Sequence, residues 1–310
     1  MKRFFILASA AIVALASCAK TEVVSTNGPQ EIAFRQITNP ITKADALATT
    51  LALGVYAHQD AALYFDNTSF THNGTDWTGG RYWPFDNSAL DFTVYAPYNN
   101  NTGTAFDATN KILTLGQVTA AEALYYGTQR YDDVTKPQNN ASYAVTLKHV
   151  SSKLSVSVKG TDNVFKLKSL VLNNPIKTGD VDVNYSASPA TVTVENNPTP
   201  TKGDITFLSS ASTVLTSTAT QIGDVAYVLP GTQTKFTIVF EQYTNGIDKE
   251  QKLEFTREID LSDAEWVANK QYHYTIEITA DEIHLTATID DWDTPVVEEG
   301  LNNGSMTIPA

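Results

Sequence analysis

The residue whose chemistry is most specific is Cys18, the only cysteine in the chain. It ends the run Leu15-Ala16-Ser17-Cys18, which matches the bacterial lipobox. In that motif the cysteine thiol receives a diacylglycerol, and signal peptidase II cuts between Ser17 and Cys18. Before it, Lys2 and Arg3 precede an apolar run of about a dozen residues, typical of a secretory signal and too short to span a membrane. We therefore predict that residues 1–17 are removed and that Cys18 is lipidated, the alternative being an unmodified thiol.

The charge of the chain argues against binding to nucleic acid and against electrostatic binding to a membrane surface. The formal net charge is −13 and the isoelectric point is near 4.7. Such a chain has no basic stripe to displace counterions from a polyanion, so we expect no nucleic-acid partner. Anionic headgroups do not attract it either. Two or three acyl chains, at about 0.8 kcal/mol per buried methylene, would carry the membrane association by themselves.

The remaining residues of catalytic type form no recognised motif. The five histidines show no HExxH spacing, and a second cysteine that could complete a zinc site is absent from the sequence. The sequence also has no GxSxG elbow and no P-loop. His273 and His284 fall at polar positions of alternating segments, which predicts solvated or hydrogen-bonded side chains. We therefore expect no enzyme, no metal and no cofactor.

The densest acidic cluster consists of Asp290, Asp291 and Asp293. Calcium prefers several carboxylate oxygens, but this spacing matches no EF-hand loop. Aspartate is also a common turn residue. We interpret the cluster as the exposed end of a strand.

Four aromatic residues, Trp77, Tyr82, Trp83 and Phe85, cluster in and after a glycine-rich stretch at 74–80. Planar rings can stack on the apolar faces of sugars, and core packing is the rival interpretation. For Tyr82 and Trp83 the structural role is favoured. Trp77, in its glycine-rich loop, is the aromatic residue that we select as facing a ligand.

Short segments of alternating polarity recur between Gly, Asn, Asp and Pro residues, which is typical of an all-β sandwich protein. Examples are 92–96, 236–240 and 272–279. Residues 18–30 are polar and predict an extended tether. The clearest helical signal is the capping-box spacing from Ser262 to Glu265, for which we expect about one or two helical turns.

The polarity pattern reverses in the middle of the chain. Tyr143 and Val145 are apolar at odd positions, whereas Leu154 and Val156 are apolar at even positions. A one-residue shift sends every side chain to the opposite face of a sheet. Either a β-bulge lies near residues 151–152, or the chain leaves one sheet there and enters another. We place a domain boundary here, which gives domains at 31–150 and 151–310. Their lengths agree with a usual domain size of about 150 residues.

Four segments in order resemble the fimbrillin (Mfa-like) family, the type V pilus subunits of Bacteroidales-type bacteria. They are the lipobox followed by Ile32-Ala33-Phe34; Tyr82-Trp83-Pro84 leading into 90–97; 145–149 leading into Ser152-Lys153-Leu154; and 266–272 followed by Asp291-Trp292. The resemblance implies two tandem transthyretin-like β-sandwich domains. It also implies export as a lipoprotein to the outer membrane and the cell surface.

The resemblance further implies proteolytic removal of the first strand, followed by polymerisation with other fimbrial subunits through strand exchange. The family is commonly cut at an arginine, whereas this chain has Lys43-Ala44 at the aligned position. We predict cleavage between Lys43 and Ala44. Arg35 is a weaker candidate because it lies in an alternating run, and a paired strand is a poor protease substrate.

Two functional interpretations stay open. In the first, the chain is a structural or adhesive subunit of a fimbria. Residues 296–297 or 306–308 could then supply an exchange strand, although a frayed tail is the favoured interpretation of 293–310. In the second, the chain is a permanently anchored surface lipoprotein that binds a glycan or another host or bacterial surface ligand.

Overall fold

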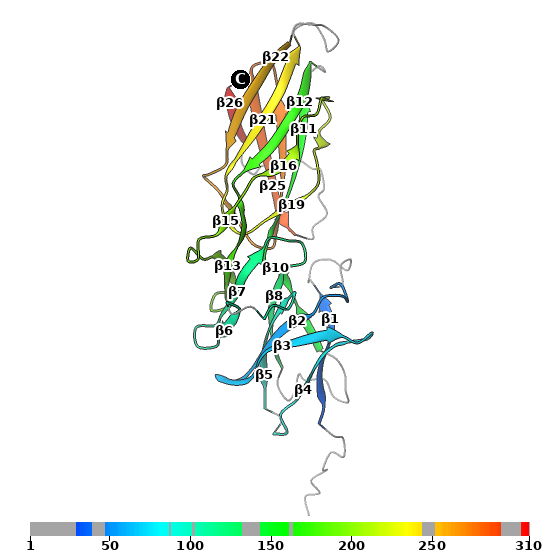
Figure 1. Ribbon diagram of the computed structural model, residues 1–310, viewed down its shortest axis with the longest axis vertical. Helices are drawn as coiled ribbons and strands as arrows, with labels where there is room; N and C mark the ends of the chain where they lie inside the picture. The colour runs from blue at the N-terminus through cyan, green and yellow to red at the C-terminus, as the bar shows by residue number, and fades with distance from the viewer. Residues whose placement is uncertain are drawn as a thin grey trace, which may run out of the picture.

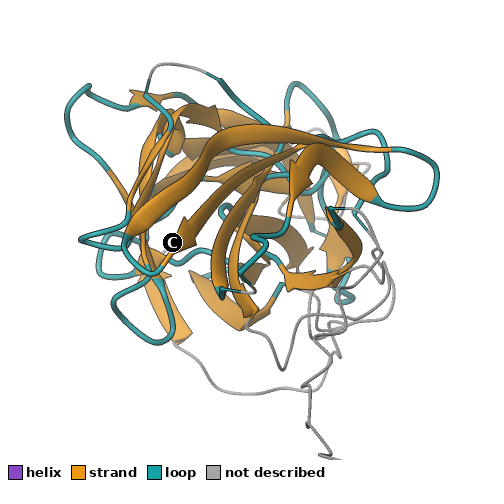
Figure 2. Cartoon of the chain, turned by 90° about the horizontal axis from the view of Figure 1, so that it is seen from below, coloured by secondary structure: helices purple, strands orange, loops and turns teal. Residues whose placement is uncertain are grey.

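The computed structural model describes residues 29–38, 47–86, 88–100, 103–131, 143–160, 164–243, 252–292 and 305–309, with the backbone alone at 36–38 and 305–309. These residues form strands, turns and loops, and none of them is helical (Figure 2). Accordingly, no helix within the described ranges has the length and apolar character needed to cross a bilayer. The prediction of an all-β protein is confirmed.

One eight-stranded sheet forms the frame of the N-terminal half. Every neighbouring pair in it is antiparallel except β1 with β9, which run parallel. In spatial order the strands are β10 (Lys148–His149), β8 (Tyr125–Tyr131), β5 (Leu90–Ala96), β2 (Leu53–Gln59), β3 (Ala62–His72), β4 (Trp77–Tyr82), β1 (Glu31–Thr38) and β9 (Tyr143–Thr146).

This sheet curls so that its two ends face each other across an aromatic core. Phe34 of β1 lies edge-on to Phe92 of β5, with ring centroids 5.4 Å apart, although three strands separate β1 from β5 in the sheet. Tyr131 of β8 meets Tyr143 of β9 at 4.8 Å. Full burial of an aromatic side chain of this size stabilises the fold by about 1.5–3 kcal/mol.

A five-stranded sheet covers the other face of this frame, and it contains strands from both halves of the sequence (Figure 1). Val181 and Val183 pair with Leu115 and Leu113 in the register of β13 with β7. Their side chains pack against tyrosines of the frame such as Tyr95. The strands are β14 (Thr191–Val194), β13 (Ile176–Asn184), β7 (Ile112–Thr119) and β6 (Ala105–Asp107), with β15 (Thr201–Lys202) beside β13.

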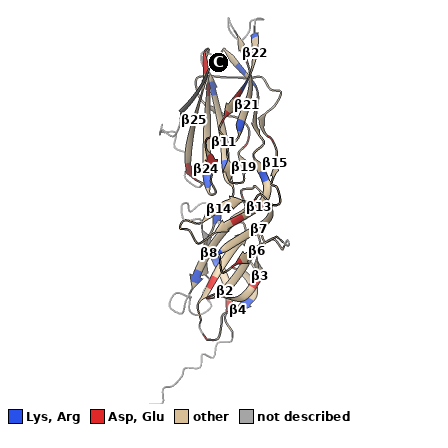
Figure 3. Cartoon of the chain, turned by 90° about the vertical axis from the view of Figure 1, so that its left-hand side faces the viewer, with Lys and Arg blue, Asp and Glu red and all other residues tan. Residues whose placement is uncertain are grey.

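The remaining strands form a second sandwich, at the upper end of Figure 1. Its first sheet holds β18 (Thr220–Gln221), β11 (Ser152–Gly160), β24 (Lys270–Ile278), β25 (Glu282–Asp291) and β26 (Ser305–Pro309), with β19 (Ala226–Val228) beside β11. Its second sheet holds β16 (Ile205–Leu208), β12 (Phe165–Asn173), β21 (Lys235–Tyr243) and β22 (Lys252–Asp260), with β17 (Thr213–Val214) beside β12. A short ribbon pairs β20 (Gly231–Thr232) with β23 (Glu265–Trp266). Figure 3 shows acidic and basic residues on strands in both halves of the molecule.

The polarity reversal near residue 151 marks a change of sheet. β10, ending at His149, belongs to the eight-stranded frame, whereas β11, beginning at Ser152, belongs to the second sandwich. This confirms the second of the two alternatives for the reversal. The division into domains at residue 150 stays a prediction, as does their transthyretin-like character, and β7 and β13 pair across that division.

The helical turn expected at 262–265 is wrong. The N–H of Ser262 donates to Asp260 Oδ1 at 2.9 Å, and the N–H of Ala264 donates to the carbonyl of Leu261 at 3.1 Å, which closes a turn. Glu265 and Trp266 then form β23. Trp266 is 2% exposed, so its burial in the core outweighs the local helix signal.

Candidate functional site: the first strand and its groove

The first strand of the frame, β1, has one fully buried face. Ile32 and Phe34 are both 0% exposed, whereas Arg35 is exposed. The Phe34 ring packs against Phe70 and Phe92, with centroids at 5.5 Å and 5.4 Å. Period-two alternation explains this arrangement, because residues 32 and 34 point to the same side of a strand. β1 therefore contributes two apolar side chains to the middle of the aromatic core.

Both edges of β1 are paired. On one side it runs antiparallel to β4, with Ala33 opposite Thr78, and on the other it runs parallel to β9. The N–H of Trp83 donates to the carbonyl of Gln30 at 2.9 Å, and the N–H of Gly80 donates to Glu31 Oε1 at 3.1 Å. Removal of β1 would leave an apolar groove whose rims, β4 and β9, carry unpaired backbone groups.

Arg35 lies within this strand, as the sequence predicted. Its guanidinium group forms two hydrogen bonds to the Asp76 carboxylate, at 2.9 Å and 3.3 Å. The Arg35 side chain is 58% exposed, so an ion pair of this kind contributes at most about 1 kcal/mol. The buried face, rather than this ion pair, holds the strand in place.

The predicted processing residues flank β1 in the sequence. Ser17 and Cys18 precede it, and Lys43-Ala44 follow it; both pairs lie outside the described residues. The strand ends at Thr38, and the described chain resumes at Leu47, which is 5% exposed and packs in the core of the frame. Lipidation and cleavage at these positions stay predictions.

Trp77 does not face a ligand, and that prediction is wrong. The side chain is 4% exposed and belongs to the core of the frame. Its indole N–H donates to the carbonyl of Leu51 at 3.0 Å, and its ring lies 4.5 Å from that of His72. The second half of the glycine-rich stretch, from Trp77 to Gly80, belongs to the paired strand β4, and the pairing turns the indole inward. The exposed members of the aromatic cluster are instead Tyr82, at 46%, and Phe85, at 89%.

The candidate metal ligands are held by hydrogen bonds and ion pairs. Ser155 Oγ lies 2.8 Å from His273 Nδ1, and His284 Nε2 lies 2.7 Å from Glu282 Oε1, as expected of polar strand positions. Lys270 Nζ binds Asp291 Oδ1 at 2.7 Å. Among the described residues, no three His, Cys, Asp or Glu side chains are grouped to hold a metal ion.

The C-terminal tail contains a strand, so the favoured interpretation of a frayed tail is wrong for residues 305–309. β26 pairs antiparallel with β25 at the edge of the second sandwich, with Met306 opposite Leu285 and Ile308 opposite Ile283. The other candidate exchange segment, 296–297, lies outside the described residues. The tail can therefore adopt the extended conformation that strand exchange requires.

Comparison with known proteins identifies the family. Residues 37–292 match the model of the fimbrillin-like family. The chain belongs to this family. Fimbrillin-like proteins are fimbrial proteins of the cell surface, so membership confirms the resemblance seen in the sequence and makes other fimbrial subunits the expected partners. No curated protein sequence matches the chain.

Two solved structures show the same fold as this fimbrillin-like chain. A fimbrial protein from Bacteroides vulgatus ATCC 8482 is 15% identical, with a TM-score of 0.60 over 84% of this chain and 99% of its own. A "putative cell adhesion protein" from Bacteroides uniformis ATCC 8492 is 18% identical, with a TM-score of 0.51 over 85% of this chain and 99% of its own. At these identities the likeness shows the fold alone.

One feature of the fimbrillin-like chain escaped the sequence analysis. A cavity opens beside β5, where polar Asp91 and Thr93 alternate with buried Phe92 and Val94. That alternation places Asp91 and Thr93 on the opposite face of the sheet. The local sequence does not show that the turn between β6 and β7 lies next to Asp91 and Thr93 in the folded protein.

Proposed function

We propose that this fimbrillin-like protein is a structural and adhesive subunit of a fimbria, assembled by strand exchange at the groove that β1 occupies. In this proposal Cys18 carries the lipid of the exported precursor, and a protease cuts between Lys43 and Ala44. The cut separates β1 from the rest of the subunit. A strand from a neighbouring subunit then takes its place between β4 and β9.

The observation that carries this proposal is the position of β1. It is an internal strand of the frame, yet it is the first strand within the described residues, and the segment 39–46 joins it to Leu47. A cut in that segment therefore frees β1 without breaking any other described strand. An incoming strand would recover the pairing on both rims and the two buried positions of Ile32 and Phe34.

A head-to-tail contact of this kind produces a filament, because a strand donated by one subunit fills the groove of the next without closing the chain of contacts. β26 is the described segment best suited to donate. It lies at the edge of its sheet, and only β25 pairs with it among the described strands.

Locking β1 in place tests strand exchange directly. The pair Ala33→Cys/Thr78→Cys joins residues that lie opposite each other in β1 and β4. Cross-strand partners have Cα atoms about 4.5–5.5 Å apart, within the span of a disulfide. Cys18 is the only native cysteine, so the new thiols have little competition. We expect the oxidised variant to stay monomeric after protease treatment and to polymerise once it is reduced.

The matched control is Val239→Cys/Thr256→Cys, which joins β21 to β22 far from the groove. This variant should polymerise in both redox states. N-terminal sequencing of sheared polymer should begin at Ala44. Polymer that retains β1, or that forms equally well with β1 locked, would contradict the proposal.

A further inference from the structure

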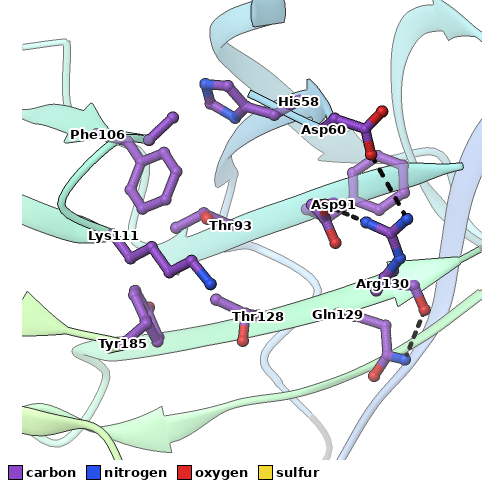
Figure 4. A pocket seen from close by; sticks show the side chains of 12 residues that line it. His58, Asp60, Asp91, Thr93, Phe106, Lys111, Thr128, Gln129, Arg130 and Tyr185 are labelled. Carbon is purple, nitrogen blue, oxygen red and sulfur yellow. Dashed lines mark hydrogen bonds and ion pairs between the residues drawn. The ribbon is translucent and has the colours of Figure 1, made fainter. Parts of the chain in front are cut away.

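A cavity of about 360 Å³ lies outside the groove of β1, on the face of the frame opposite its aromatic core (Figure 4). Its floor comes from three neighbouring strands. His58, Asp91 and Arg130 are cross-strand partners on β2, β5 and β8, and Thr93 and Thr128 pair two residues further along. Because side chains two residues apart share a face, both rows point into the cavity.

The wall of the cavity comes from the turn between β6 and β7, together with Tyr185 at the end of β13. The Asp107 carboxylate accepts the N–H groups of Thr109 and Asn110 at 2.9 Å and 3.0 Å, which fixes the turn. The N–H of Tyr185 donates to the carbonyl of Lys111 at 2.9 Å. The cavity is therefore formed before any ligand enters, as small-molecule sites usually are.

Two buried polar atoms at the cavity have no hydrogen-bond partner, His58 Nδ1 and the Tyr185 hydroxyl. The His58 side chain is 5% exposed. Burial lowers the pKa of His58 and raises that of Tyr185, so both groups are uncharged at neutral pH. Leaving such groups unpaired destabilises a fold, and neither atom is exposed to solvent, so each can bind a ligand hydroxyl group once its side chain rotates toward the cavity.

The charges around the cavity cancel. Arg130 Nη1 lies 2.5 Å from Asp91 Oδ2, and its Nη2 lies 3.8 Å from Asp60 Oδ1. Lys111 contributes a second positive charge and makes no ion pair with a described residue. Two basic and two acidic side chains leave no net charge to attract an ion. This balance favours a neutral ligand over a charged one.

The cavity also has an aromatic wall. The Phe106 ring lies 5.2 Å from that of His58 and 6.4 Å from that of Tyr185, and it is half-buried at the edge of the space (Figure 4). A flat apolar ring beside uncharged hydrogen-bonding groups suits a molecule with one apolar face and several hydroxyl groups. We propose that this cavity binds one unit of a neutral carbohydrate, held against Phe106 and hydrogen-bonded by His58, Tyr185 and Lys111.

A carbohydrate site would give the fimbrial subunit its adhesive role. The biological use of the site therefore rests on the proposed function, whereas binding of the sugar itself does not. Strand exchange can fail without affecting it, because the cavity lies on the opposite face of the frame from the buried face of β1. The volume is near the lower end of the range for ligand pockets, about 300–1,000 Å³, which suits a single sugar ring.

Binding can be measured on the monomeric full chain by titration calorimetry and saturation-transfer NMR. The probes are the methyl glycosides of glucose, galactose, mannose and N-acetylglucosamine, with N-acetylneuraminic acid and inorganic phosphate as charged comparisons. We expect saturable binding of at least one neutral glycoside with a dissociation constant on the order of 1 mM, as a dozen non-hydrogen atoms give at ordinary ligand efficiency.

Two variants locate the binding. Phe106→Ala should weaken it about tenfold by removing the stacking surface. Lys111→Asn should weaken it several-fold, and Asn tolerates the left-handed backbone at this position, where φ is 56°. Phe85→Ala and Lys202→Asn are the matched controls, because both residues are exposed and neither lines the cavity.

Both controls should bind as the parent does, and thermal unfolding of every variant reports whether it is folded. Three results would overturn the proposal: no saturable binding of any neutral glycoside, equal binding by Lys111→Asn and Lys202→Asn, or tighter binding of phosphate or N-acetylneuraminic acid than of every neutral probe. Polymer formation enters none of these measurements.

Discussion

The imidazole of His149 lies flat against the indole of Trp292, with ring centroids 4.0 Å apart and 12° between the ring planes. His149 belongs to β10 of the frame, whereas Trp292 directly follows β25 of the second sandwich. Tyr227 stacks on the same indole at 5.6 Å. The Asn269 side chain accepts the N–H of His149 at 3.0 Å, and its backbone carbonyl accepts the N–H of Trp292 at 3.2 Å. This contact joins the frame to the second sandwich.

Replacing Trp292 with alanine should loosen this junction. The side chain is 3% exposed, and truncation of a buried tryptophan costs about 3–5 kcal/mol. Chemical denaturation followed by intrinsic fluorescence measures the loss. Phe85→Ala is the control, because its ring is 89% exposed and its removal should change the free energy of unfolding by less than about 0.5 kcal/mol. Equal free energies of unfolding for the two variants would show that the aromatic stack on Trp292 does not stabilise the junction.

Glu241 should make stability depend on pH. Lys252 Nζ and the Tyr243 hydroxyl bind its carboxylate at 2.5 Å and 2.7 Å, and they lower the pKa of Glu241 from 4.5 to about 2. Because the folded-state pKa is depressed, its contribution is complete above about pH 4.5 and is lost as the pH falls through about 2.

Glu241→Gln should therefore destabilise the protein at pH 7 by about 1–3 kcal/mol, with a difference from the parent that shrinks toward zero near pH 2. Glu258→Gln removes the exposed ion pair with Lys235 and should change stability by less than about 1 kcal/mol. Denaturant titrations at several pH values measure both. A pH-independent cost for Glu241→Gln would exclude the carboxylate as the source.

Variants at Phe34 and Arg35 distinguish two interactions that could hold β1 in the frame, burial of the Phe34 ring and the ion pair of Arg35 with Asp76. Phe34→Ala empties a fully buried position and should cost about 3–5 kcal/mol. Arg35→Gln removes an exposed ion pair and should cost at most about 1 kcal/mol. Hydrogen exchange at the amides of β1 should rise in the first variant and change little in the second. The opposite order would mean that Asp76, rather than the core, holds the strand.

Gly54→Ala should disturb the tyrosine beneath it. A Cβ atom on Gly54 would overlap the ring of Tyr95, whose hydroxyl donates to Asn67 Oδ1 at 2.7 Å. Displacing a buried ring costs about 1–3 kcal/mol. Gly203→Ala is the control, since the nearest atom there lies at 3.6 Å and belongs to the flexible Lys177 side chain. Thermal unfolding distinguishes the two, and equal melting temperatures would refute the close packing at Gly54.

The parts of the fold that the sequence predicted correctly are those set by local alternation. Residues 272–278 alternate as β24 does, and the shift in parity between Val145 and Leu154 marks the change of sheet. Ser262 to Glu265 carried a local helix signal, but burial of Trp266 in a strand prevailed. Trp77 looked exposed in its glycine-rich loop, but it lies in β4, whose pairing with β3 and β1 turns it inward.

The candidate sites follow the same division. Arg35 was placed correctly in a strand, because alternation is local. The cavity was missed, because it needs Phe106 of β6, Lys111 of the following turn and Tyr185, which follows β13 more than seventy residues later, to meet beside His58. Long-range contacts of this kind leave no periodic signal in a single sequence.

The pairing of β7 with β13 has a consequence for the order in which the chain folds. Leu113 and Leu115 of β7 gain their cross-strand neighbours Val183 and Val181 only when β13 is available, so the N-terminal half cannot complete its second sheet on its own. During synthesis β13 is available only after about residue 184, and until then β7 presents an open sheet edge on one side. A chaperone that shields such an edge would have its main task during this interval.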